Sequence, residues 1–110
     1  MIARVWRGWT MQANADAYEA GVRAHAPKIA QSQGFCSMQL LRNDGEHECE
    51  FVTVTCFATM DDVRSFAGAA YTRAVIPEAL RSVITRVEPE VRHYTVPVVQ
   101  SVLAGAMSRS

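Results

Sequence analysis

The spacing of apolar residues changes along the chain between the two-residue repeat of a strand and the three-to-four-residue repeat of a helix. Residues 2–9 are rich in β-branched and aromatic types and end at polar residues, which predicts a first strand. Asn14 is typical of a helix N-cap, and apolar positions then recur at steps of three and four as far as Ile29, so a helix with one buried stripe is expected. Pro27 is expected to break or kink this helix, leaving a short turn over residues 28–32.

Two further strands joined by a hairpin are predicted next. Residues 35–42 and 50–57 form the strands, and the Asp-Gly pair within residues 43–46 is typical of the tight turn between them. In the second strand, valines alternate with phenylalanines and threonines, so neither face is made for water. We interpret the following residues as the face that the helices leave uncovered: Phe51, Thr53, Thr55 and Phe57. Something apolar must then cover that face.

A second helix and a last strand complete the predicted elements. Thr59 and Asp62 resemble a capping box with Asp in place of Glu, which marks the start of the helix. Its buried stripe consists of Val63, Phe66, Ala67 and Ala70. The remaining elements are an irregular helical stretch over residues 71–76, a short helix from Pro77 through Ile84, and a strand over residues 91–96.

The predicted order is β-α-β-β-α-β over residues 1–96. This order consists of two split βαβ units. Such units fold by right-handed crossovers into an α+β, ferredoxin-like domain with a four-stranded antiparallel sheet and both helices on one face. The uncovered face predicts a homodimer in which two sheets meet as a barrel around a mainly apolar cavity. In the tail, residues 97–110, the apolar residues have helical spacing, so a short helix lying on the partner subunit and a frayed terminus are the two alternatives.

Charge and composition narrow the range of partners. The 11 basic and 11 acidic residues cancel, and neither sign forms a long run, so nucleic acid and membrane surfaces are not expected as partners. We expect a cytoplasmic protein, since the chain contains neither a signal-peptide pattern nor a membrane-spanning apolar stretch. All but one of the basic residues are Arg, which is typical of a GC-rich bacterial coding sequence. The three cysteines lack the paired short spacings of a zinc site, so we predict reduced thiols, no disulfide framework and no metal.

His93 is the candidate catalytic residue, because imidazole titrates near neutral pH and can remove a proton from an acidic phenol or C–H group. Strand alternation groups it with Val91 and Thr95 but does not reveal which face of that strand points inward. A purely structural role for His93 is the alternative. His25 is expected to pack on the first helix, and His47 to be exposed in the hairpin loop.

The candidate substrate-binding residues share strands with these positions. Trp6 could stack on a planar aromatic molecule or belong to the core, and Trp9 lies on the opposite face by parity. Arg4 shares the face of Trp6, so its side chain requires a carboxylate or a substrate anion, or must reach the rim of the sheet. The other candidates are two hydroxyls, two apolar walls and a phenol that could bind a ligand or cap the second helix: Thr53, Thr55, Phe57, Phe66 and Tyr71.

Four segments carry a family resemblance: Met-Ile-Ala-Arg-Val-Trp-Arg-Gly at residues 1–8, residues 51–68, Tyr-Thr-Arg-Ala-Val at residues 71–75, and Val-Arg-His-Tyr-Thr-Val at residues 91–96. With these, residues 1–96 resemble the antibiotic biosynthesis monooxygenase-like family of dimeric α+β barrels. That family includes cofactor-free quinone-forming monooxygenases, haem-degrading enzymes and members without assigned chemistry. Where quinone-forming relatives carry Asn and Trp, this chain has Thr53 and Phe57. Where haem-degrading relatives place an iron-ligating His, it has Phe66 and Ala67, so haem degradation is not expected.

The resemblance and the apolar strand face together predict a dimeric barrel that binds a small apolar or aromatic molecule. The leading hypothesis is a monooxygenase that oxidises a phenolic or polyketide-like aromatic without a cofactor. A non-catalytic ligand-binding or stress-associated dimer is the alternative from another class, and an isomerase or lyase is a third.

Overall fold

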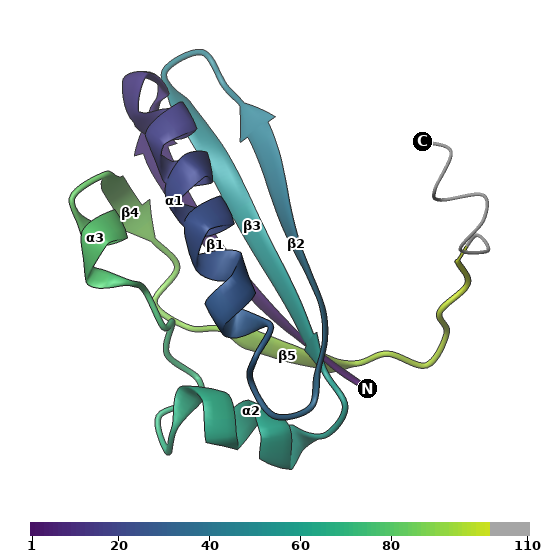
Figure 1. Cartoon of the computed structure of the whole chain (residues 1–110). Helices are drawn as coiled ribbons and strands as arrows, with labels where there is room; N and C mark the ends of the chain where they lie inside the picture. Colours follow the sequence, from purple (N-terminus) through teal and green to yellow (C-terminus); the bar gives the residue numbers. More distant parts are fainter. Residues whose placement is uncertain (102–110) are drawn as a thin grey trace.

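The body of the molecule is an antiparallel sheet, and the computed structural model describes residues 1–101 of the chain (Figure 1). Its strands are β1 (Ile2–Met11), β2 (Phe35–Asp44), β3 (Glu48–Phe57), β4 (Ile84–Val87) and β5 (Arg92–Thr95). β3 pairs with β1 along its full length, and β4 and β5 pair with the two ends of the other edge of β1. The strand order β2-β3-β1-β4 is that of the predicted ferredoxin-like sheet, with the fourth strand in two pieces. The predicted α+β fold is confirmed.

The break between β4 and β5 corrects the prediction for residues 77–96. Ile84, predicted to end the short helix, instead begins a strand over Ile84–Val87, as the three β-branched residues of this segment favour. The backbone N–H of Glu88 still donates to the Arg7 carbonyl, and Pro89, which has no N–H, follows where the chain leaves the sheet. The N–H of Val91 then bonds the Thr72 carbonyl instead of a strand neighbour. A detour over residues 88–91 therefore fastens the sheet edge to the segment that follows the second helix.

The helices differ from the prediction at their ends. They are α1 (Ala15–Ile29), α2 (Met60–Ala67) and the four-residue α3 (Glu78–Arg81), and a 3-10 turn, η1 (Gln12–Asn14), leads into α1. Asn14 occupies the N-cap position of α1, as predicted, but because the 3-10 turn is continuous with the helix, it has helical dihedrals and its side chain makes no cap hydrogen bond. Pro27 does not break α1, which continues to Ile29. Because Pro27 lies close to the end of the helix, its missing N–H removes only one backbone hydrogen bond.

The capping box of α2 is confirmed. Thr59 accepts a hydrogen bond from the backbone N–H of Asp62, and the Asp62 carboxylate accepts from the backbone N–H of Thr59 at 3.1 Å. The helix ends before Gly68, so Ala70 lies outside it and is exposed, in contrast to the predicted stripe. Residues 71–76 are not helical but form an open segment that passes over the sheet, and α3 ends before Ile84.

The pairing register shows which residues share a face of the sheet. Arg4, Trp6 and Gly8 lie opposite Thr55, Thr53 and Phe51. This face packs against the helices, with 4.6 Å between the ring centroids of Tyr18 and Phe51 and 5.3 Å between those of Phe57 and Phe66. The interpretation of Phe51, Thr53, Thr55 and Phe57 as the uncovered face is therefore wrong. Strand alternation gives the parity of these residues but not the side on which the helices pack.

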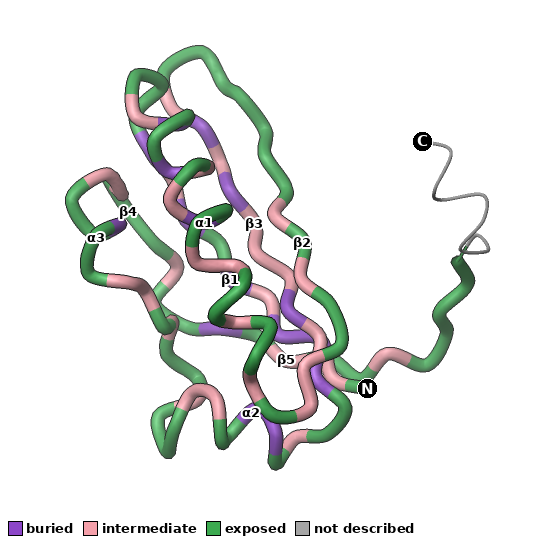
Figure 2. Tube along the Cα trace, in the orientation of Figure 1, coloured by how far each residue is buried: buried purple, intermediate pink, exposed green. Residues whose placement is uncertain are grey.

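The outer face of the sheet is nevertheless apolar over much of its area. It carries Ala3, Val5, Leu41, Val52, Val54, Cys56 and Tyr94, of which Leu41 and Tyr94 are each 49% exposed. Figure 2 shows that buried residues concentrate along β1 and β3, where α1 covers the sheet. The hydrophobic core thus lies on the helix side, and the outer face has no cover from the described part of this chain.

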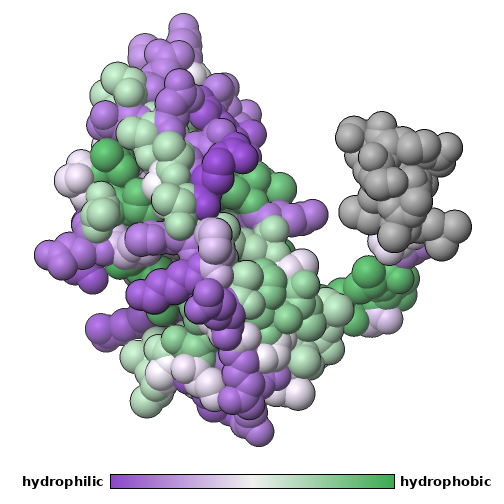
Figure 3. All heavy atoms as spheres, in the orientation of Figure 1, coloured by the Kyte–Doolittle hydropathy of each residue, from purple (hydrophilic) through white to green (hydrophobic). Residues whose placement is uncertain are grey.

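Beyond β5, residues 97–101 have no regular secondary structure and run away from the sheet (Figure 1). Val98 and Val99 are exposed there, and Figure 3 shows hydrophobic surface on this part of the chain. The predicted tail helix reaches into residues 102–110, outside the described residues. Among residues 1–101, no helix has the length and hydrophobicity needed to cross a bilayer.

Candidate functional site

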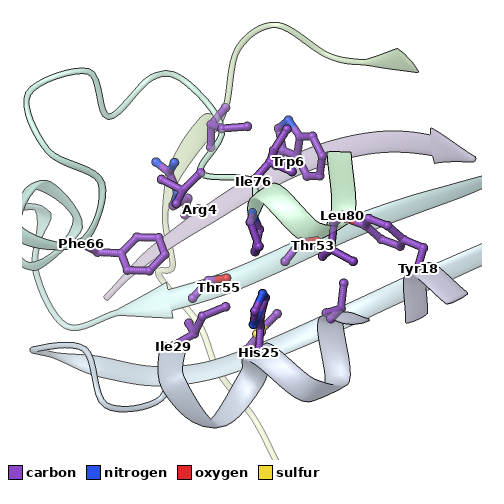
Figure 4. A pocket seen from close by; sticks show the side chains of 16 residues that line it. Arg4, Trp6, Tyr18, His25, Ile29, Thr53, Thr55, Phe66, Ile76 and Leu80 are labelled. Carbon is purple, nitrogen blue, oxygen red and sulfur yellow. The ribbon is translucent and has the colours of Figure 1, made fainter. Parts of the chain in front are cut away.

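A cavity of two adjoining parts lies between the inner face of the sheet and α1, bordered by Phe66 of α2 and by residues 74–80. Figure 4 shows the side chains that line its inner part. The inner part holds about 70 Å³ and the outer part about 530 Å³, and six residues border both. Five predicted substrate-binding residues line the inner part: Arg4, Trp6, Thr53, Thr55 and Phe66. This cavity is lined by residues of one chain. A cavity between the facing sheets of two subunits stays a prediction.

Arg4 is the charged group of the inner part. Its side chain comes from β1 and is only 5% exposed, and it donates hydrogen bonds to the backbone carbonyls of Tyr71 and Arg73, the latter at 2.8 Å. Burial lowers the pKa of Arg4 to about 10, so the guanidinium remains protonated at neutral pH. Within residues 1–101, no carboxylate lies within ion-pair distance of it. Its positive charge is therefore met by carbonyl dipoles and, at 5.8 Å, by the face of the Phe66 ring.

His93 lies beside Arg4 on the inner side, which settles the face that strand alternation left open. The two residues are opposite each other in the pairing of β1 with β5, and His93 Nε2 is 3.0 Å from a guanidinium nitrogen of Arg4. Because that nitrogen can only donate, Nε2 is the acceptor and the imidazole proton sits on Nδ1. Burial, and then the charge of Arg4, lower the pKa of His93. His93 does not line the cavity, so it reaches the site through Arg4.

Aromatic side chains form the walls. Trp6 is buried, and its indole N–H donates to the Glu88 carbonyl at 3.2 Å, which fixes the ring at the cavity. Burial raises the pKa of Tyr18 to about 12, an effect that the Thr53 side chain partly offsets, so the phenol stays protonated and able to donate. Trp9 lies on the outer face as parity predicted, with the Arg86 guanidinium 3.8 Å from its ring centroid.

Two predicted binding residues lie outside the cavity lining. Phe57 is fully buried between the rings of Phe35 and Phe66, so it supports Phe66 from behind. The ring of Tyr71 packs edge-on against His93 at 5.6 Å, while its carbonyl accepts from Arg4. Both residues hold the neighbours of the cavity in place.

His25 is the residue that sequence reasoning missed. It is half-buried on α1, borders both parts of the cavity and points into the space between α1 and the sheet (Figure 4). Its place on the apolar stripe was recognised, but helical periodicity cannot distinguish packing against a side chain from packing against a cavity. His47 is exposed, as expected.

No group of three or more His, Cys, Asp or Glu side chains within residues 1–101 could hold a metal ion. All three cysteines are free: Cys36 is exposed, Cys56 is half-buried and Cys49 is buried in the core.

Solved structures with the same fold were found, although no family model matches the chain and no curated protein matches it. The haem degrader MhuD from Mycobacterium tuberculosis is 19% identical, with a TM-score of 0.64, over 92% of this chain and all of MhuD. SnoaB from Streptomyces nogalater, a cofactor-independent oxygenase, is 22% identical with a TM-score of 0.61, over 89% of this chain and 94% of its own. This chain has the fold that they share.

Fold similarity at this level of identity does not transfer a catalytic residue. It confirms the resemblance in architecture over most of the chain. The sequence departs from quinone-forming relatives at two positions, which lie in different parts of the structure. Thr53 lines the cavity, and Phe57 lies in the core. Any chemistry in the cavity therefore depends on the side chains that line it.

Proposed function

We propose that this protein binds a small aromatic molecule carrying an acidic oxygen in the cavity between α1 and the sheet, and oxidises it with dioxygen without a cofactor. The observation that carries the proposal is the buried guanidinium of Arg4, which lines an otherwise mainly apolar cavity and has no carboxylate partner in the described chain. Removing a charge from water costs several kcal/mol unless an opposite charge or hydrogen bonds offset it. The carbonyls of Tyr71 and Arg73 offset part of this cost, and a phenolate or enolate of the ligand supplies the opposite charge.

The walls suit a planar ring system. Trp6 and Phe66 provide aromatic surface for stacking, and the hydroxyls of Tyr18, Thr53 and Thr55 provide hydrogen bonds for oxygen substituents. Small-molecule sites commonly combine such apolar walls with a few fixed polar groups.

The reaction needs only the ligand anion and dioxygen. Arg4 stabilises the anion formed by loss of a proton, and the anion gives one electron to dioxygen, producing a ligand radical and superoxide. The two radicals combine to form a C–O bond, and protonation gives a hydroperoxide. Cleavage of its O–O bond, with loss of the remaining C–H proton, releases water and leaves a carbonyl. An anthrone and dioxygen thus yield an anthraquinone and water, with no external reductant.

Two histidines could serve this chemistry in different ways. His25 borders the cavity, so it is the imidazole that can contact a bound ligand and accept its proton. His93 accepts a hydrogen bond from Arg4 and so acts as a positioning residue in this proposal. A catalytic role for His93 itself stays a prediction.

Oxygen uptake with 1,8-dihydroxyanthrone tests the proposal. We expect protein-dependent uptake, formation of 1,8-dihydroxyanthraquinone, and a rate at least tenfold lower in both His25→Gln and His93→Ala. His93→Gln, which keeps an acceptor for Arg4 but cannot act as a base, separates the two roles of His93. It retains most of the rate if His93 positions Arg4, and it is as slow as His93→Ala if His93 is the base.

Binding without oxygen uptake would contradict the oxidation and favour the second candidate, a non-catalytic ligand-binding protein. The observation in favour of this candidate is that His93, the predicted base, does not line the cavity. Absence of both binding and uptake would contradict the whole proposal.

The apolar outer face supports a homodimer as the working form. Val5, Val52 and Val54 lie at its centre and are only half-buried, although each Å² of apolar surface removed from water contributes about 25 cal/mol. A second copy of the chain offers the same apolar face, so the two sheets cover each other. In this arrangement each subunit keeps its own cavity on the opposite side of its sheet.

A further inference from the structure

Two positively charged side chains line the cavity without a carboxylate partner in the described chain. Arg4 lines the inner part and Lys28, in the last turn of α1, lines the outer part. Carboxylates are not scarce, because five other cations each form an ion pair: Arg7, Arg23, Arg42, Arg64 and Arg86. Of the ten Lys and Arg side chains in residues 1–101, five form no ion pair, and Arg4 and Lys28 are the two of these five that line the cavity.

Between these two cations the cavity is mainly apolar. Ile29, Phe66, Val75, Ile76 and Pro77 border both parts, together with His25. The outer part adds polar side chains near Lys28, namely Ser32, Gln33 and Ser65. A ligand that extends through the cavity therefore meets a cation, an apolar middle, and then a second cation among hydrogen-bonding groups.

We infer that the outer part is a second anion-binding subsite, in which Lys28 takes a carboxylate at the far end of the ring system whose acidic oxygen contacts Arg4. This inference rests on the proposed function and narrows its substrate class to aromatic carboxylic acids that also bear a phenolic or enolic oxygen. The ammonium group of Lys28 suits this position, because it is a compact charge on a flexible stem and can follow a carboxylate in a wide, solvent-open chamber. His25, at the junction, can bond an oxygen in either part.

Lys28 has an alternative role that binding measurements can separate. A cation in the last turn of a helix interacts favourably with the helix dipole, so Lys28 also stabilises α1. That role affects the stability of the protein but does not make it prefer one ligand over another.

A matched pair of ligands tests the subsite. 1,8-Dihydroxyanthraquinone and its 3-carboxylate share the same rings and hydroxyls, so their affinities differ only through the carboxylate. We expect equilibrium dialysis against the wild-type protein to show at least fivefold tighter binding of the carboxylate. Lys28→Gln removes this preference without weakening binding of the parent compound, which lacks the carboxylate, and Lys28→Arg keeps the preference.

Arg23→Gln is the control, because Arg23 lies on the same helix, is exposed and pairs with Glu19 away from the cavity. It keeps the preference, which excludes an effect of net charge alone. Equal wild-type affinities for the two compounds, or a preference that survives Lys28→Gln, overturn the subsite while leaving the proposed function intact. Failure of both compounds to bind overturns the subsite and the proposed function together.

Discussion

At the scale of single residues, Arg4 and His93 act as one unit. Arg4 is buried and charged, and it donates hydrogen bonds to two backbone carbonyls of the segment that follows α2. It donates a third hydrogen bond to Nε2 of His93. A protonated His93 could not accept that hydrogen bond and would place a second positive charge beside the guanidinium. The pair is therefore stable only while the imidazole is neutral.

This coupling predicts a pH dependence of stability. The pKa of His93 is lower in the folded protein than in the unfolded chain, so the unfolded state binds the proton more readily. Well above pH 6.5, His93 is neutral in both states and its titration does not change the free energy of unfolding. As the pH falls through 6.5, protonation of His93 in the unfolded chain lowers that free energy. Urea unfolding at pH 7.5 and pH 5 should show a larger loss of unfolding free energy for the wild type than for His93→Gln. An identical loss in the two proteins would show that His93 titrates freely in the fold.

At the scale of elements, the turn between α1 and β2 packs closely against the start of α2. Gly34 has a φ of +71°, a left-handed conformation that glycine adopts without strain. A Cβ at Gly34 would lie 2.0 Å from Oδ2 of Asp62, the carboxylate that caps α2. The absence of a side chain at Gly34 thus allows the capped helix to approach the turn that leads into β2.

Two glycine substitutions separate this clash from backbone strain. Gly68 also has a positive φ, of +81°, but a Cβ there meets no atom within 4 Å. We expect Gly68→Ala to cost on the order of 1–3 kcal/mol from backbone strain alone. Gly34→Ala should cost more, because Asp62 must also move and the cap of α2 is lost, worth about 1 kcal/mol by itself. Chemical denaturation of both variants measures the difference, and equal losses would mean that Asp62 adapts freely.

At the scale of the whole molecule, the two faces of the sheet differ in what packs against them. The inner face holds the core and the cavity, and the outer face is apolar without a cover from the described chain. Val54→Glu, opposite Val5 at the centre of the outer face, should turn a dimer at micromolar concentration into a monomer that retains its fold. Sedimentation analysis measures this change, with Ala24→Glu on the exposed side of α1 as the control. A wild-type protein that sediments as a monomer would contradict the dimer.

The sequence predicted the fold better than the site, for reasons that individual residues make clear. Alternation in β1 correctly grouped Arg4 with Trp6 and opposed Trp9, and Thr59 with Asp62 marked the start of α2. A local pattern does not show on which face of the sheet the helices pack, so the prediction that Phe51, Thr53, Thr55 and Phe57 form the uncovered face is wrong. His25 and Lys28 became candidates only when the fold placed residues 71–80 opposite α1, a contact between segments about 50 residues apart that no local pattern records.

The central claim is that Arg4 binds an acidic oxygen of a ligand inside a single chain, and it is tested most directly by the affinity for 1,8-dihydroxyanthraquinone. Quenching of tryptophan fluorescence gives the dissociation constant, since Trp6 lines the cavity. We expect Arg4→Gln to bind at least tenfold more weakly than the wild type and Arg4→Lys to retain most of the affinity, with unchanged circular dichroism for each. Equal affinities of the wild type and a folded Arg4→Gln would contradict the account.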